Sequence, residues 1–225
     1  MTDFFSSLTS IIGGVLRLDA ATFQNLLASP KNLELALATL IIAGISLMLG
    51  QSVVLFVNRV DRVRFVLSLA ASALMLIIGV FFWALSIWAV TQFVMGLSGS
   101  IRDTFIIVAA GHAPLIYGFL VLLPHLGRII HVVLRVWMFV AVWVGVTAVY
   151  DTTPLFGLAA VLLGWLLLEI VTHFLPILDS VQDRLWQLAT GRRQMRSAQE
   201  VVDYYVQRAR ERVESAYEDS EGGGK

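Results

Sequence analysis

The stretch FVLSLAASALMLIIGVFFWALSIWAVTQFVM, residues 65–95, decides the fold class, because it contains no charged side chain over its whole length. A helix of about 20 mainly apolar residues crosses a hydrocarbon core about 30 Å thick, so this stretch is long enough to span a membrane. A membrane β-strand is not expected, because the apolar residues are continuous and do not alternate with polar ones.

Four further apolar runs lie on either side of this stretch. They are Leu35–Val57, Phe105–Leu123, Ile129–Tyr150 and Leu155–Leu178. The linkers between the runs are short, which makes successive spans antiparallel neighbours. We therefore predict an all-α polytopic membrane protein in which residues 31–178 form five transmembrane helices. The expected spans are about 35–57, 65–95, 105–123, 129–150 and 155–178.

The overall composition agrees with a membrane domain. Of the 225 residues, 58% are hydrophobic and 14% are charged, and the mean hydropathy is +0.81. A typical globular domain is about 45–50% apolar and about 25% charged, so this chain has too little polar surface for a soluble domain. The formal net charge of zero gives no indication of nucleic-acid binding. Because the chain has no cysteine, disulfides, cysteine-ligated metals and thiol nucleophiles are excluded.

Amphipathic segments flank the predicted membrane domain. In residues 1–30, apolar side chains from Phe4 to Val15 share one helical face, and Asp19 is expected to cap a second short helix. We interpret this segment as interfacial. Residues 179–225 hold 17 of the 32 charged side chains and form a charged amphipathic tail. There Ser197–Glu200 reads as a capping box, and an apolar stripe follows it, a surface suited to a protein partner. The stripe is Val201, Val202, Tyr205, Val206 and Val213.

Basic residues near the predicted spans indicate the orientation. Loops one and three, together with the tail, carry nine arginines close to the membrane, whereas the opposite side carries only Arg17, Lys31 and Arg102. The positive-inside rule places the nine in the cytoplasm, so we expect the N-terminus outside and the C-terminus inside. Three of the nine, Arg192, Arg193 and Arg196, are candidates for contact with anionic lipid headgroups.

Four polar residues inside the predicted spans are the candidates for an intramembrane site: Gln51, His112, Glu169 and His173. Glu169 and His173 are four residues apart and share a helical face, so they can form a buried pair. The pair is open to several interpretations: a proton relay, half of a metal site, a lipid contact or a structural lock. A metal would need further ligands, and only His112 is an obvious supplier, so we predict no metal and no cofactor.

Several motifs resemble those of the Yip family of Rab-interacting membrane proteins and their bacterial relatives. The third run contains Ala109-Ala-Gly-His-Ala-Pro-Leu115 and continues to Leu123-Pro124, and Leu134-Arg-Val-Trp137 opens the fourth. The approach Leu18-Asp-Ala-Ala-Thr-Phe23 to Ser29-Pro30 is similar to the lead-in of bacterial members. The resemblance covers roughly residues 18–175. It implies a five-helix membrane domain without known catalysis, and the absence of the acidic arm motif of eukaryotic members favours a bacterial protein.

Three functional hypotheses follow from the sequence. The first is a non-enzymatic membrane scaffold or adaptor of the bacterial cytoplasmic membrane, which binds a partner through its tail or forms a homo-oligomer. The second is a transporter or channel subunit, in which the four intramembrane polar residues meet around a cavity and Pro114 breaks the third span. The third is an enzyme acting on lipid. The first is our leading interpretation, because no catalytic constellation is recognisable in the sequence.

Overall fold

The computed structural model describes residues 2–51, 62–123 and 126–174, and all regular structure in these ranges is helical. The α-helices are α1 (Thr2–Leu16), α2 (Ala20–Ala28), α3 (Asn32–Gln51), α5 (Arg62–Ala89), α6 (Ile101–Gly111), α7 (Gly127–Val149) and α8 (Pro154–Phe174). A π-helical turn, η1 (Val90–Val94), continues α5, and a 3₁₀-helix, η2 (Ala113–Leu122), follows α6. The predicted tail, including its lipid-contact arginines and its apolar stripe, lies outside the described residues.

Four stretches are long and apolar enough to cross a membrane: Asn32–Leu49, Ala73–Val94, Ile101–Leu122 and Gly127–Val149. These stretches correspond to the first four predicted spans, so the chain has the character of an integral membrane protein. The fifth predicted span begins as expected, because α8 starts at Pro154 and Thr153 Oγ1 accepts a hydrogen bond from the Phe156 N–H. Its predicted end at Leu178 lies outside the described residues, so the fifth crossing stays a prediction.

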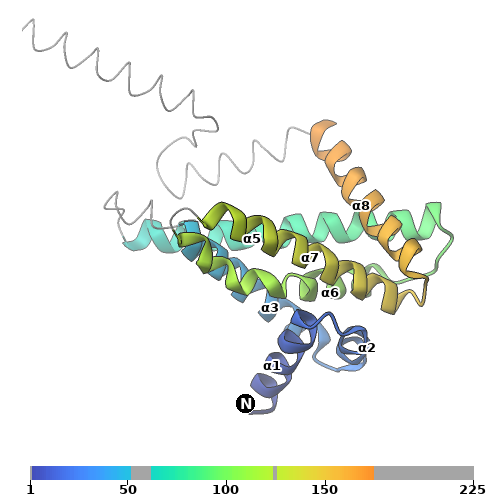
Figure 1. The fold of residues 1–225 in the computed structure, drawn as a ribbon, viewed down its shortest axis with the longest axis horizontal. Helices are drawn as coiled ribbons and strands as arrows, with labels where there is room; N and C mark the ends of the chain where they lie inside the picture. Colours follow the sequence, from blue (N-terminus) through green and yellow to red (C-terminus); the bar gives the residue numbers. More distant parts are fainter. Residues whose placement is uncertain (1, 52–61, 124–125, 175–225) are drawn as a thin grey trace, which may run out of the picture.

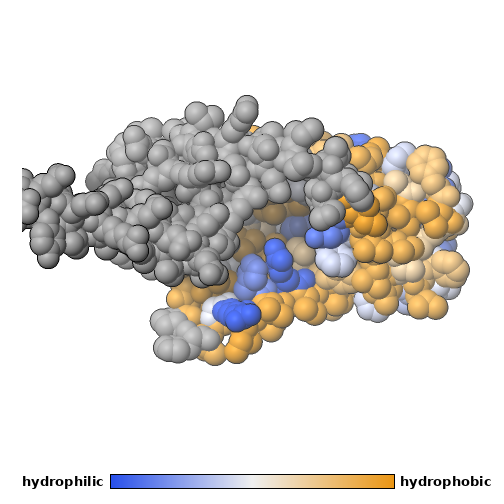
Figure 2. All heavy atoms as spheres, turned by 90° about the horizontal axis from the view of Figure 1, so that it is seen from above, coloured by the Kyte–Doolittle hydropathy of each residue, from blue (hydrophilic) through white to orange (hydrophobic). Residues whose placement is uncertain are grey.

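The surface of the bundle is strongly apolar, as expected for contact with lipid tails. Figure 2 shows one face, and on the part that is not drawn in grey apolar side chains dominate, with the main group of hydrophilic ones near the middle. Exposed large side chains are numerous on the outer faces of α7 and α8, including Ile129, Val133, Leu155 and Trp165. In water such a continuous apolar surface would drive aggregation, whereas in a bilayer it is matched to its surroundings.

The two N-terminal helices pack onto the bundle. Asp19 caps α2 as predicted, with its side chain accepting a hydrogen bond from the Ala21 N–H. Both helices lie together on one side of the bundle (Figure 1), and Val15 and Phe23 are fully buried there. Gln24 Nε2 donates to the carbonyl of Ala148 at the end of α7, over 3.1 Å. Much of the apolar face of residues 1–30 is therefore covered by protein.

The third span differs from the single helix that its hydropathy predicts. It is an α-helix as far as Gly111 and a 3₁₀-helix from Ala113, with Pro114 in the first turn of the second part. Proline has no N–H, and its ring clashes with the carbonyl four residues earlier, so an α-helix cannot continue regularly through this position. A 3₁₀-helix rises about 2.0 Å per residue, and the two parts together still reach about 36 Å, enough to cross the bilayer core.

Glycines let the helices approach backbone to backbone. A Cβ atom placed on Gly118 of η2 would lie 2.8 Å from Leu47 Cα and 2.9 Å from Leu47 N on α3. The same holds for Gly164 of α8, whose Cβ would lie 2.9 Å from Ile87 Cα on α5. Close contact through small residues is the usual means by which membrane helices associate, because no hydrophobic effect drives them together within lipid.

We expect Gly118→Ala to lower the stability of the bundle by about 1–3 kcal/mol, because the added methyl group collides with α3 backbone atoms that cannot rotate away. The matched control is Gly79→Ala, since Gly79 lies in α5 with no atom near the position of a Cβ. Alanine is favoured over glycine in a helix by about 0.5–1 kcal/mol, so this control should be neutral or stabilising. The measurement is thermal unfolding of both variants in the same detergent. Equal melting temperatures would contradict the proposed contact.

Candidate functional site

The structure describes the side chains of two of the four predicted intramembrane residues. Gln51 ends α3 and His173 lies in the last turn of α8, but their side chains are outside the described part, as is the predicted Glu169–His173 pairing. His112 and Glu169 can be compared directly. His112 is 4% exposed at the break in the third span, whereas Glu169 is exposed on α8.

The hydrogen bonds of His112 explain how the break is tolerated. In a regular α-helix the carbonyl of Val108 would accept from the backbone N–H of residue 112. Here that N–H turns to the carbonyl of Ala109, over 3.2 Å, and the imidazole Nδ1 lies 2.7 Å from the Val108 oxygen instead. Because a carbonyl only accepts, Nδ1 must carry the proton. The side chain of His112 therefore replaces a backbone hydrogen bond that the break removes.

Aromatic rings surround the other side of the imidazole. The Trp83 ring of α5 makes an edge-on contact with it at a centroid distance of 6.0 Å, and Phe139 of α7 stacks on Trp83 at 6.3 Å. Within the described ranges, Trp83 Nε1 is buried and has no hydrogen-bond partner. His112 is thus held between α5 and its own helix by aromatic packing and by one hydrogen bond.

A second side chain supports the backbone of the third span from outside. The hydroxyl of Ser46, on α3, lies 2.5 Å from the carbonyl oxygen of Ile116 and 3.1 Å from the backbone N of Phe119. It can donate to the first and accept from the second, which are the two groups that a 3₁₀-helix would join directly. Ser46 and Gly118 therefore fix η2 against α3 at the same place.

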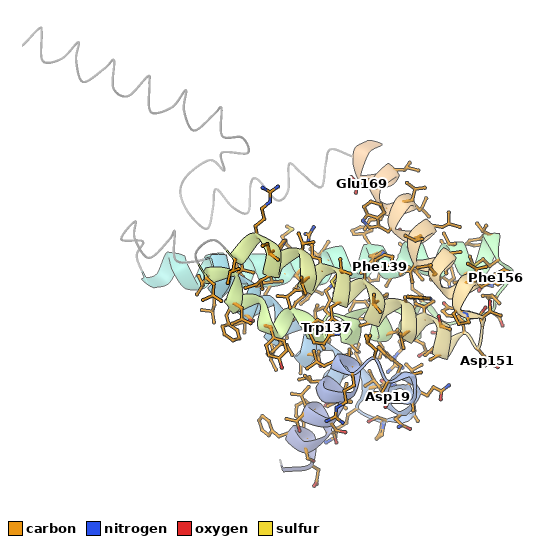
Figure 3. All side chains as sticks on the ribbon, viewed as in Figure 1. Asp19, Trp137, Phe139, Asp151, Phe156 and Glu169 are labelled. Atoms are coloured by element: carbon orange, nitrogen blue, oxygen red, sulfur yellow. The ribbon has the colours of Figure 1, made fainter. Side chains whose placement is uncertain are left out.

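Glu169 has surroundings unlike those of His112. Figure 3 places it on the part of α8 that leaves the bundle, on the side opposite Asp19. The structure brings His112 to the aromatic side chains of Trp83 and Phe139, whereas Glu169 is exposed on α8. In the three described stretches of chain, no group of three or more His, Asp or Glu side chains could hold a metal ion.

Polar contacts that the sequence did not indicate join the helix ends on one side of the bundle, called here the Arg102 end. Arg102 of α6 donates to Asn32 Oδ1 over 2.7 Å, and Asn32 Nδ2 donates to the carbonyl of Leu27 over 3.0 Å. Trp88 and Trp143 donate their indole N–H to the carbonyls of Gly99 and Pro154. Tryptophan with a polar tip is typical of the membrane–water interface.

Comparison of the whole chain with protein-family models, with curated proteins and with solved structures found no match. The resemblance to the Yip family accordingly rests on the sequence motifs alone.

The hydrogen bond from His112 to Val108 can be tested with one substitution that removes the donor and one that retains a donor. His112→Leu keeps much of the volume but removes the donor, and we expect a loss of about 1–3 kcal/mol, because the Val108 carbonyl is left without a partner. His112→Asn retains a short N–H donor and should recover part of that loss. Thermal unfolding in detergent measures both. If the leucine variant proves as stable as the natural chain, the role assigned to His112 is wrong.

Proposed function

We propose that this chain is an integral membrane scaffold or adaptor without catalytic activity, which presents its C-terminal segment 179–225 to a protein partner. The observation that carries the proposal is how the buried polar side chains of the bundle are used. Thr39 bonds to the carbonyl of Leu35, Ser46 to the backbone of η2, and His112 to the carbonyl of Val108. Such contacts hold backbone in place and suit a bundle whose role is structural.

The resemblance to bacterial Yip proteins supports the same proposal. The motifs that carry it include His112, Pro114 and the sequence around Trp137, all in the third and fourth spans. A family of five-span proteins without known catalysis fits a chain in which the described side chains form no recognisable catalytic group. In this proposal α8 completes a fifth crossing, and the chain lies in a bacterial cytoplasmic membrane with its C-terminus inside.

The transport alternative is favoured by one observation, the helix break at His112 and Pro114 within a membrane-spanning stretch. Broken helices often line ion or substrate sites, where freed carbonyls act as ligands. Here, however, the carbonyl of Val108 accepts a hydrogen bond from the side chain of His112, and the carbonyl of Ile116 accepts one from Ser46. Because these two carbonyls at the break are already hydrogen-bonded, we favour the scaffold.

The topology can be tested by single-cysteine labelling, because the chain has no cysteine of its own. Ser10→Cys places a thiol on an exposed position of α1, and Ser220→Cys places one in the tail. In intact cells a membrane-impermeant maleimide should modify the first and should reach the second only after permeabilisation. Modification of both from one side would overturn the odd number of crossings.

The adaptor role can be tested by affinity purification of the full chain in mild detergent. We expect Tyr205→Glu to abolish recovery of a specific partner, because a charge within the apolar stripe opposes burial in a partner's groove. The matched control is Tyr204→Glu, since helical spacing places that residue away from the stripe. Deletion of residues 197–225 should act as Tyr205→Glu does. Unchanged partners after the deletion would refute the adaptor role.

A further inference from the structure

Helix α7 carries positive charge into the membrane-spanning part of the bundle, and no carboxylate of the described residues pairs with it. Helix α7 holds Arg128, His131 and Arg135, and at about 100° per residue these three project within a 60° arc. We call this arc the basic face of α7. Both arginines are exposed and His131 is half-buried. The basic face therefore lies on the outside of the bundle, where a molecule from the bilayer can reach it.

The depth of Arg135 makes its charge unusual. It lies eight residues after Gly127, the first residue of α7, which is about 12 Å along the helix axis. A charge at this depth is costly unless the side chain reaches towards the interface or meets a group of opposite sign. Arg128 lies two helical turns nearer the start of α7. If the side chain of Arg135 extends towards the interface, its guanidinium therefore comes closer to that of Arg128.

The protein does not supply the opposite charge in the described residues. An ion pair between two described residues joins Arg102 to Asp103 over 3.9 Å, at the other end of the bundle. The sequence contains no Asp or Glu between Asp103 and Asp151, so α7 and the preceding loop carry only positive charge. An anion from outside the bundle would therefore meet two guanidinium groups with no competing carboxylate on the same helix.

The side chains beside the basic face suit the rest of a lipid molecule. Exposed aliphatic residues follow one another along the adjoining face of α7, namely Ile129, Val132, Val133 and Val136, each at least half exposed. If the phosphate of a phospholipid lies near Arg128, the acyl chains of that lipid can run along this aliphatic surface towards the bilayer centre. Soluble phosphates have no counterpart to these contacts.

We propose that the basic face of α7 binds one anionic phospholipid, with the phosphate held by Arg128 and Arg135 and the acyl chains lying on Ile129, Val132 and Val136. His131, between the two arginines, supplies a further hydrogen-bonding group at the headgroup. Guanidinium groups are well matched to phosphate, because their N–H groups bind two oxygens at once. This site is separate from Arg192, Arg193 and Arg196 of the tail.

Native mass spectrometry of the full chain in detergent tests this site. Phosphatidylglycerol and phosphatidylcholine with identical acyl chains are titrated against the protein. We expect the anionic lipid to bind more tightly, and Arg128→Gln with Arg135→Gln to lower its affinity about 30-fold, which corresponds to about 1 kcal/mol for each charge. The control removes two charges from the opposite end, by Arg17→Gln with Lys31→Gln, and should leave the affinity unchanged.

Three further arms separate this site from its alternatives. Arg135→Lys keeps the charge and should retain most of the lipid binding. Comparison with Arg135→Gln then shows whether the loss of charge, and not a misfolded bundle, lowers the affinity. Soluble glycerol phosphate should fail to displace the lipid, because it lacks acyl chains. A photoactivatable phosphatidylglycerol should crosslink within residues 127–139 of α7.

The proposal is overturned if the double α7 variant binds phosphatidylglycerol as the natural chain does, or if the two lipids bind equally well. It is also overturned if Arg192→Gln, Arg193→Gln and Arg196→Gln together remove the binding while the α7 variant does not. Displacement by glycerol phosphate, or crosslinks confined to other helices, would likewise exclude this face as a lipid site.

Discussion

Within a bilayer, every backbone N–H and C=O group must find its partner inside the protein, and the third span meets this constraint only with help from side chains. Pro114 ends the α-helix in the middle of the crossing, which leaves backbone groups unmatched on both sides of the break. The imidazole of His112 donates to the backbone carbonyl of Val108. The hydroxyl of Ser46 bridges the carbonyl of Ile116 and the backbone N–H of Phe119. One side chain of the span itself and one of α3 therefore help to hold the broken helix together.

The same contacts show why a buried polar residue in a membrane protein need not mark a site of chemistry. His112 is polar, buried and within a span, which are the features that made it a functional candidate from sequence. Its position two residues before Pro114 gives it a structural task, because the backbone carbonyl of Val108 lies within reach of its own ring. The proximity of Trp83 and Phe139 then fills the remaining space with aromatic carbon.

Hydropathy predicted the helical class and four of the spans, because a 20-residue apolar run has few alternatives in any environment. Pro114 in the sequence indicated a break in the third span, but hydropathy could not predict that the chain continues as a 3₁₀-helix or that Gly118 lies against the backbone of Leu47 on α3. It also gave no sign of Ser46 or Asn32. A single serine or asparagine in an apolar run looks the same whether it faces lipid, backbone or a neighbouring helix, and only the packing distinguishes these cases.

The arginines of the bundle are of two kinds, which differ in whether the described protein supplies their partner. At the Arg102 end, the guanidinium of Arg102 binds Asn32, so its charge is used within the protein to join α6 to the start of α3. On α7 the arginines project outward beside aliphatic side chains, and the described residues offer them no acid. The orientation argument counts arginines near the predicted spans. Such counts do not distinguish an arginine that binds a protein group from one that projects outward. Which situation applies depends on the partners that surround each guanidinium, and among the described residues Arg128 and Arg135 have no carboxylate partner.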